Sequence, residues 1–151
     1  MPVRSVLLIE DEPFSAELSG TFLAGLNCEV VHESDGKSAL QTARQRKFDL
    51  ILIDLYMPRM DGAAVMRALR ELPGHASVPS VLLTADEFAP LERDDLDAFT
   101  DVLIKPVARE HYVALLQRLD RAAVKDEAVK RDGGEQPAPA STARDRDPGR
   151  A

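Results

Sequence analysis

Polar residues that can do chemistry follow several short apolar runs of the sequence. These residues are Glu10, Asp11, Glu12, Asp54, Thr84 and Lys105, the last followed directly by Pro106. They supply carboxylates, a hydroxyl group and an ammonium group. Clustered carboxylates repel one another and must be neutralised by protons or by a metal ion. Ligation by oxygen alone, with open positions for water, favours magnesium over zinc.

The same residues suggest a reaction. An aspartate held beside a cation is a credible nucleophile toward a phosphoryl group, which makes Asp54 the candidate reacting residue. Thr84 could donate a hydrogen bond to a phosphoryl oxygen, and Lys105 could balance the phosphoryl charge. The sequence therefore suggests acyl-phosphate chemistry assisted by Mg²⁺.

Short apolar runs alternate with longer amphipathic segments, the pattern of a parallel sheet covered by helices. We expect strands at 3–9, 29–32, 50–53, 80–84 and 101–104. We expect helices at 13–26, 35–46, 61–72, 90–99 and 109–124, the first from a stripe of Phe14, Leu18, Phe22 and Leu26. The prediction is an α/β fold with a doubly wound, five-stranded parallel sheet. Ligands of such sheets bind outside the carboxyl ends of the strands.

The 151 residues fit one domain followed by a tail. We expect the domain at 1–124, and a helix extension with a disordered tail or linker at 125–151. After about Val129, proline, alanine, glycine and balanced charges replace apolar bulk. The net charge of −7 belongs to 1–124, because the remainder holds equal numbers of acidic and basic residues. A negatively charged domain at 1–124 argues against direct binding to nucleic acid.

Composition also bears on the compartment. No apolar run approaches the roughly 20 residues that span a bilayer, so we expect no membrane association. The N-terminus lacks the apolar core and cleavage site of a signal peptide. Cys28, the single cysteine, allows no intramolecular disulfide and is interpreted as strand packing. We therefore expect a cytoplasmic protein.

The motifs resemble the receiver domains of response regulators in bacterial two-component systems. The matching pieces, in order, are VLLIEDE, LILIDLYMPRMDG, SVLLTA and DVLIKP. Each alone would be a weak signal, whereas the ordered combination is highly specific. The resemblance implies a flavodoxin-like fold with five helices around the sheet. It also implies that the protein is phosphorylated by a sensor histidine kinase or a phosphotransfer protein and signals to an unknown downstream protein.

Carried over by position, the resemblance implies specific roles. Asp54 would be the phosphoacceptor. Asp11 would bind Mg²⁺ directly, and Glu10 would bind it directly or support the direct ligands. The backbone carbonyl of Tyr56 would add another oxygen ligand.

The resemblance also assigns the residues that respond to phosphorylation, which together act as a switch. Thr84 would follow the phosphoryl group, Lys105 would pair with it, and Pro106 matches a position that often follows a cis peptide bond. Tyr56 and Asp86 would tune the access of hydrolytic water. In-line attack of Asp54 on a phosphohistidine is the implied reaction, and slow hydrolysis would reset the switch, so the protein is not expected to be a conventional turnover enzyme.

The chain departs from the family where receivers usually carry an aromatic residue, because Val102 stands there. Val107 replaces a frequent phenylalanine, and Phe99 could substitute for the missing ring. A receiver-like scaffold that binds partners without phosphorylation is therefore an alternative. A haloacid-dehalogenase-type phosphatase would need a second aspartate where Tyr56 stands. His32, His75 and His111 are interpreted as surface or packing residues, and Asp61 with Gly62 as a turn and helix start.

Overall fold

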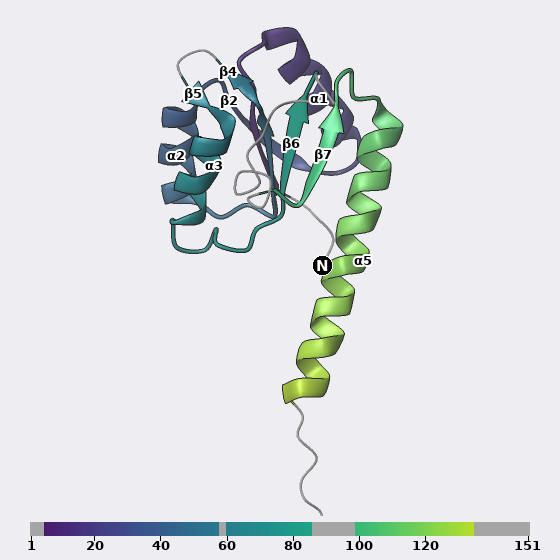
Figure 1. The fold of residues 1–151 in the computed structure, drawn as a ribbon. Helices are drawn as coiled ribbons and strands as arrows, with labels where there is room; N and C mark the ends of the chain where they lie inside the picture. Colours follow the sequence, from purple (N-terminus) through teal and green to yellow (C-terminus); the bar gives the residue numbers. More distant parts are fainter. Residues whose placement is uncertain (1–4, 58–59, 86–98, 135–151) are drawn as a thin grey trace, which may run out of the picture.

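The computed structural model describes residues 5–57, 60–85 and 99–134 (Figure 1). Its main sheet contains β1 (Ser5–Ile9), β2 (Glu29–Glu33), β3 (Leu50–Asp54), β6 (Ser80–Thr84) and β7 (Asp101–Ile104). The strand order is β2-β1-β3-β6-β7, and every pairing is parallel. This is the expected doubly wound sheet. Because all strands run the same way, their carboxyl ends meet at one edge.

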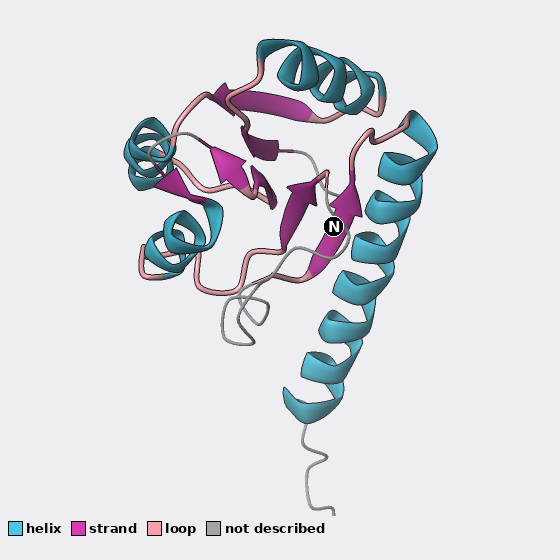
Figure 2. Cartoon of the chain, turned by 45° about the horizontal axis from the view of Figure 1, so that its top comes forward, coloured by secondary structure: helices cyan, strands magenta, loops and turns pink. Residues whose placement is uncertain are grey.

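Helices lie on both faces of the sheet (Figures 1 and 2). They are α1 (Pro13–Gly25), α2 (Gly36–Gln45), α3 (Gly62–Arg70) and α5 (Arg109–Gly134). Alternating strand residues feed two cores: Val6, Leu8 and Leu52 pack with α1 and α5, and Leu7, Ile9 and Ile53 pack with α2 and α3. Every residue of β3 is buried, because helices cover this central strand on both sides.

Helix starts follow the sequence signals. Asp35 caps α2 by accepting from the Ser38 amide at 2.8 Å, and Asp61 caps α3 by accepting from the Ala63 amide at 3.0 Å. An acceptor side chain at this position satisfies an amide that has no partner inside the helix. The expected turn and helix start at Asp61 and Gly62 is therefore confirmed.

The apolar stripe that predicted α1 does not face the core along its whole length. Phe14 is 70% exposed and Leu18 is 38% exposed, whereas Ala16, Ser19 and Leu23 are buried. A spacing of four exceeds the helical repeat of 3.6, so such a stripe rotates away from the core by roughly 40° at each step. The helix was predicted correctly, and the orientation of its first turns was not.

The helix expected at 109–124 and the helix extension expected after it form one continuous helix, α5, which runs to Gly134 and extends away from the sheet (Figure 1). A short antiparallel hairpin, β4 (Tyr56–Met57) with β5 (Met60–Asp61), was not predicted. The helix expected at 90–99 and the tail beyond 134 lie almost entirely outside the described residues.

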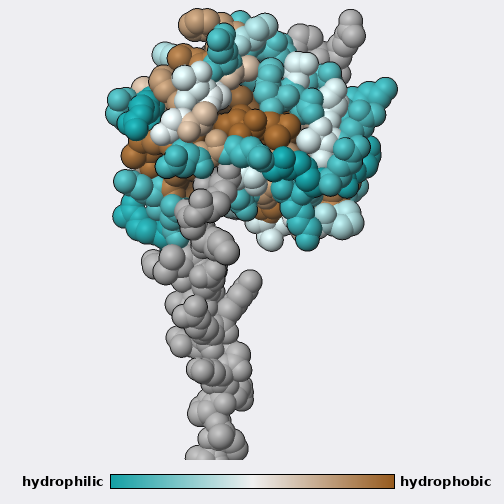
Figure 3. Space-filling model, turned by 180° about the vertical axis from the view of Figure 1, so that it is seen from behind, coloured by the Kyte–Doolittle hydropathy of each residue, from teal (hydrophilic) through white to brown (hydrophobic). Residues whose placement is uncertain are grey.

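The described surface is mainly polar with local apolar exceptions. On the face drawn in Figure 3, hydrophobic residues gather toward the middle and hydrophilic ones surround them. Phe14 is the most exposed large hydrophobic residue of the described part of the chain. None of the helices in these segments has both the length and the apolar character needed to span a bilayer.

Candidate functional site: an acidic cluster at the carboxyl edge of the sheet

The site begins where β1 ends. After Ile9 the chain leaves the strand, and Pro13 occupies the start of α1, where its missing amide hydrogen costs nothing. Glu12 caps this helix, accepting from the amides of Ser15 at 2.7 Å and Phe14 at 3.1 Å. These bonds, that from Ser15 first, lower the pKa of the Glu12 carboxyl. Capping is therefore done by Glu12, which leaves Glu10 and Asp11 for the site.

Three carboxylates converge at the sheet edge. Glu10, Asp11 and Asp54 each offer an oxygen atom, and these atoms lie within 4.8 Å of one another. Glu10 is 1% exposed and Asp54 is 6% exposed, whereas Asp11 is partly accessible. Glu10 and Asp54 follow or end β1 and β3, which are direct neighbours in the sheet. The sequence prediction that these groups lie together agrees with this geometry.

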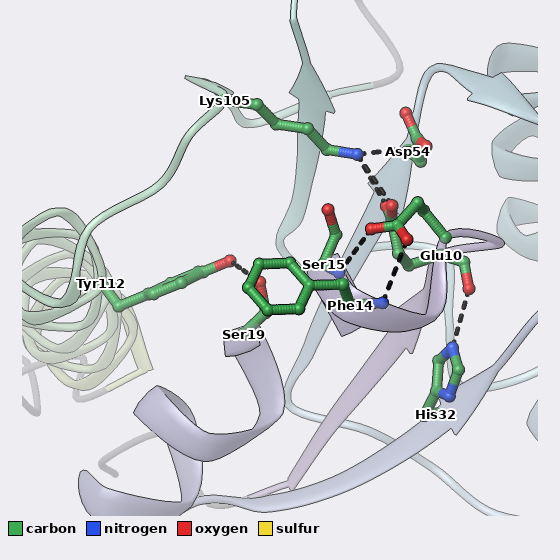
Figure 4. Close-up of polar contacts among 9 residues, drawn as sticks. Glu10, Phe14, Ser15, Ser19, His32, Asp54, Lys105 and Tyr112 are labelled. Atoms are coloured by element: carbon green, nitrogen blue, oxygen red, sulfur yellow. Dashed lines mark hydrogen bonds and ion pairs between the residues drawn. The ribbon is translucent and has the colours of Figure 1, made fainter. Parts of the chain in front are cut away.

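Lys105, which follows β7, reaches into the cluster (Figure 4). Its Nζ lies 2.8 Å and 3.0 Å from the Glu10 carboxylate oxygens and 3.2 Å from Asp54 Oδ2. Its amide donates to the carbonyl oxygen of Thr84 at 2.8 Å, which ties the ends of β6 and β7 together. The Lys105–Pro106 peptide bond is cis. One ammonium group thus contacts two of the three carboxylates.

Electrostatics in the cluster reflect burial. Desolvation, the largest cause, and the charge of Asp54 together raise the pKa of the Glu10 carboxyl to about 7, although the hydrogen bond and the charge of Lys105 lower it. Burial alone would lower the pKa of Lys105, but the bond to Glu10 and the charges of both carboxylates raise it above its ordinary value. The raised pKa of Lys105 keeps its ammonium group charged near neutral pH, and the raised pKa of Glu10 lets this carboxyl take up a proton there.

A glycine lets α3 pack against the end of β3. A Cβ atom added at Gly62 would lie 2.6 Å from the backbone oxygen of Asp54, closer than side-chain carbons approach backbone. The Gly62 amide donates to the Leu55 carbonyl at 3.3 Å. Absence of a side chain at Gly62 therefore allows the loop after Asp54 to fold tightly beside the cluster.

The donor set fits a hard divalent cation. It consists of carboxylate oxygens only, and its formal charge from three carboxylates exceeds the charge of Lys105. Oxygen ligands with part of the site open to solvent suit Mg²⁺. The partial exposure of Asp11 leaves such an opening.

The remaining predicted residues are placed as follows. Thr84 is 2% exposed at the end of β6. Tyr56 lies in β4, two residues after Asp54, and its side chain is outside the described part. Asp86 lies outside the described residues altogether. Val102 is 38% exposed, Val107 is buried in the α1 and α5 core, and Phe99 packs against the α2 and α3 core.

The sequence did not indicate two contacts of the site. His32 Nε2 lies 2.7 Å from the carbonyl oxygen of Glu10, and Tyr112 of α5 bonds Ser19 of α1 at 2.7 Å in the interior (Figure 4). Neither pair has a sequence spacing that signals contact. The strand order was the available clue for His32, because it puts β2 beside β1.

Comparison with known proteins shows which family this chain resembles. Residues 6–117 match the family described as the response regulator receiver domain. The chain is 33% identical over 115 residues to the signal transduction histidine-protein kinase BarA of Escherichia coli K12, covering 76% of this chain. It is 30% identical over 122 residues to the transcription factor SKN7 of Candida albicans, covering 78% of this chain. It spans only 12% and 21% of the lengths of these two relatives.

Solved structures agree in fold. The receiver domain of the sensor histidine kinase PA1611 from Pseudomonas aeruginosa PAO1, described with a magnesium ion coordinated in its active site cleft, superposes with a TM-score of 0.71 at 31% identity, covering 78% of this chain and 97% of that one. A CheY-like receiver domain from Methylobacillus flagellatus gives 0.72 at 26% identity, covering 78% and 98%.

Proposed function

The chain belongs to the response regulator receiver family, and on this premise we propose that it accepts a phosphoryl group on Asp54 within a two-component signalling pathway. One observation carries the proposal. Asp54 Oδ2 lies 3.2 Å from Lys105 Nζ, inside a cluster of carboxylates that fits Mg²⁺. A nucleophile, its counter-charge and a cation site thus occupy one edge of the sheet.

The reaction follows from these positions. A carboxylate oxygen of Asp54 attacks the phosphorus of a phosphohistidine, the new P–O bond forms as the P–N bond breaks, and the imidazole leaves and takes up a proton. Lys105 moves no proton; its ammonium group balances charge on the transferred group. A bound Mg²⁺ would supply positive charge that stabilises the phosphoryl oxygens. Glu10, Asp11 and Asp54 would hold it, with the backbone carbonyl of Tyr56 as a further ligand.

The chain modifies itself in this reaction, so we do not propose a conventional turnover enzyme. Hydrolysis of the acyl phosphate would restore Asp54. Tyr56 and Asp86, two residues beyond Asp54 and Thr84, are proposed to control the access of water. Thr84 is proposed to bond the phosphoryl group once it is in place. Residues 1–124 would form the receiver and 125–151 an appended segment, of which α5 includes the first ten residues.

The proposed phosphodonor is a sensor histidine kinase or a phosphotransfer protein. BarA, a histidine-protein kinase, is among the relatives. Beside the cluster lies an open pocket of about 290 Å³, lined by Phe14, Leu18, Pro106 and Lys105 among others. Lys105 belongs both to this pocket and to the acidic cluster, so a protein seated on the apolar rim would bring a side chain close to Asp54.

The test is phosphorylation by a small phosphodonor. Purified protein is incubated with acetyl phosphate and Mg²⁺, and intact mass is measured. A phosphate-sized gain that requires Mg²⁺ and disappears in Asp54→Asn supports the proposal. Asp49→Asn is the matched control, because Asp49 precedes the same strand at its opposite end and bonds Ser5 there.

A second function has one observation in its favour. Val102 is a half-exposed aliphatic residue where the family usually has a ring that reports phosphorylation. A folded protein that binds Mg²⁺ but gains no phosphate would favour a scaffold that binds partners constitutively.

A further inference from the structure

The peptide group that joins the two acidic residues Glu10 and Asp11 lies just after the end of β1. The paired register of β1 and β2 ends at Ile9 and Glu33, and the amide of Glu10 still donates to the Glu33 carbonyl at 3.1 Å. Beyond this point the chain after β2 enters α2, capped by Asp35.

The carbonyl of Glu10 is bonded by a side chain instead. His32 Nε2 lies 2.7 Å from this oxygen (Figure 4). A carbonyl oxygen can only accept, so Nε2 carries the hydrogen and His32 is the donor. The distance is at the short end of the normal range for such bonds. An imidazole thus fixes the carbonyl at the end of the strand ladder.

We propose that His32 is a positioning residue for the cation site: its Nε2–H group holds the Glu10–Asp11 peptide plane in the orientation that makes both carboxylates converge. The inference rests on the proposed function, because it concerns the same Mg²⁺ site. A peptide unit is planar, so fixing its carbonyl fixes the direction in which the chain enters Asp11.

Asp11 depends on this restraint more than Glu10 does. The Glu10 carboxylate is buried and bonded twice by Lys105. The Asp11 carboxylate is partly exposed, and none of the described residues donates a hydrogen bond to it. Backbone orientation is therefore what brings the Asp11 oxygen within 4.8 Å of the other two. Loss of the His32 donor should let Asp11 sample positions outside the cluster.

The expected effect is on affinity for Mg²⁺. Removal of a group that orients metal ligands usually weakens binding by about 10-fold to 100-fold. His32→Phe keeps a planar ring and removes the donor. His32→Gln places an amide Nε2–H at a similar reach. We expect the Kd for Mg²⁺ to rise about 10-fold or more in the phenylalanine variant and to return to within about 3-fold of wild type in the glutamine variant.

Isothermal titration calorimetry with MgCl₂ measures these values, and thermal unfolding in EDTA measures folding separately. Glu29→Gln is the matched control, since Glu29 lies at the other end of β2 and pairs with Arg46 on the surface. An unchanged Kd in His32→Phe, or equal losses in His32→Phe and His32→Gln, would overturn the inference.

Two further results separate this inference from the proposed function. Wild type that binds Mg²⁺ and gains phosphate, with His32→Phe doing so equally well, would refute the role of His32 alone. Wild type that binds no Mg²⁺ would refute both. Histidine ¹⁵N spectra of the wild type, with the ring neutral, provide a test that needs no variant: His32 should carry its hydrogen on Nε2, and the Nδ1–H tautomer would contradict the bond.

Discussion

Two partly buried cationic side chains in the described part of the chain, Lys105 and Arg70, have different surroundings. At the carboxyl edge of the sheet, Lys105 contacts the charged groups Glu10 and Asp54. At the amino end of β6, Arg70 donates to neutral acceptors: the carbonyls of His75 at 3.1 Å and of Val78, and Ser80 Oγ at 2.6 Å. Burial lowers the pKa of Arg70.

The difference separates the proposed reactive site from a structural one. The acceptors that hold Arg70 beside β6 include backbone and hydroxyl oxygens that cannot change charge, and these contacts fix the turn between α3 and β6. Around Lys105 the carboxylates outnumber the ammonium group, which is the arrangement that the proposed cation binding and phosphoryl transfer require. Substitution of Lys105 should therefore affect chemistry, whereas substitution of Arg70 should affect stability.

The largest effect is expected for Lys105→Met. Removing the ammonium group takes away the charge that faces the transferred phosphoryl group, and losses of such stabilising groups typically slow reactions by 10²-fold to 10³-fold. The rate of phosphorylation by acetyl phosphate, followed by intact mass, checks this. Lys37→Met, at an exposed lysine, should leave the rate unchanged. A rate within threefold of wild type in Lys105→Met, which is a change of roughly 0.7 kcal/mol in activation free energy, would contradict the proposed role of Lys105.

Arg70→Met should lower the free energy of unfolding by about 3 kcal/mol, because the partly buried carbonyl groups of His75 and Val78 lose a charged donor. Urea denaturation in EDTA measures the loss. The exposed Arg44, on α2, provides the control Arg44→Met, expected to change stability by less than about 0.5 kcal/mol. The extent of phosphorylation of folded Arg70→Met should equal that of wild type. A selective loss of phosphorylation would show that the two regions are not separate in function.

The pH dependence of stability should distinguish Glu10. The pKa of this carboxyl is raised to about 7 in the folded protein from an ordinary value of 4.5, so the folded state binds its proton more tightly than the unfolded state. Its contribution to stability is complete below pH 4.5 and is lost as the pH rises through 7. The loss amounts to about 3 kcal/mol.

Glu10→Gln resembles the protonated carboxyl and should remove this dependence. Urea denaturation of both proteins in EDTA, at a series of pH values, gives the difference curve. All other titrating groups are present in both proteins, so their contributions to the pH dependence of stability largely cancel in the difference curve. Parallel curves for the two proteins would show that Glu10 does not retain a proton on folding.

Much of the fold could be predicted because its signals are local. The apolar runs gave β6 and β7 with their observed bounds, and Asp61 marked the start of α3. Motif order brought Glu10, Asp54 and Lys105 to one edge. By contrast, the bond from His32 to Glu10 and the exposure of Phe14 depend on strand pairing and helix rotation, which residue types alone do not specify. The hairpin of β4 and β5 is too short for a periodic signal.

The smallest effect on phosphorylation is expected for a substitution at the rim of the acidic site. This substitution distinguishes residues that take part in the chemistry from residues that bind the phosphodonor protein. Phe14 is 70% exposed and borders the pocket that Lys105 also lines. Phe14→Ala removes apolar contact area without touching the carboxylates. Transfer from a phosphohistidine-bearing kinase domain that phosphorylates wild type should slow by about 3-fold to 10-fold, the loss expected from a partly buried aromatic contact.

Acetyl phosphate is the internal control, since it needs no protein surface and should phosphorylate Phe14→Ala at the wild-type rate. Equal slowing with both donors would place Phe14 in the chemistry of the site, and no slowing with either would exclude this rim from docking. A donor-specific loss would instead show that the exposed first turns of α1, the part of the helix whose orientation the sequence pattern did not predict, are the surface on which the phosphodonor is recognised.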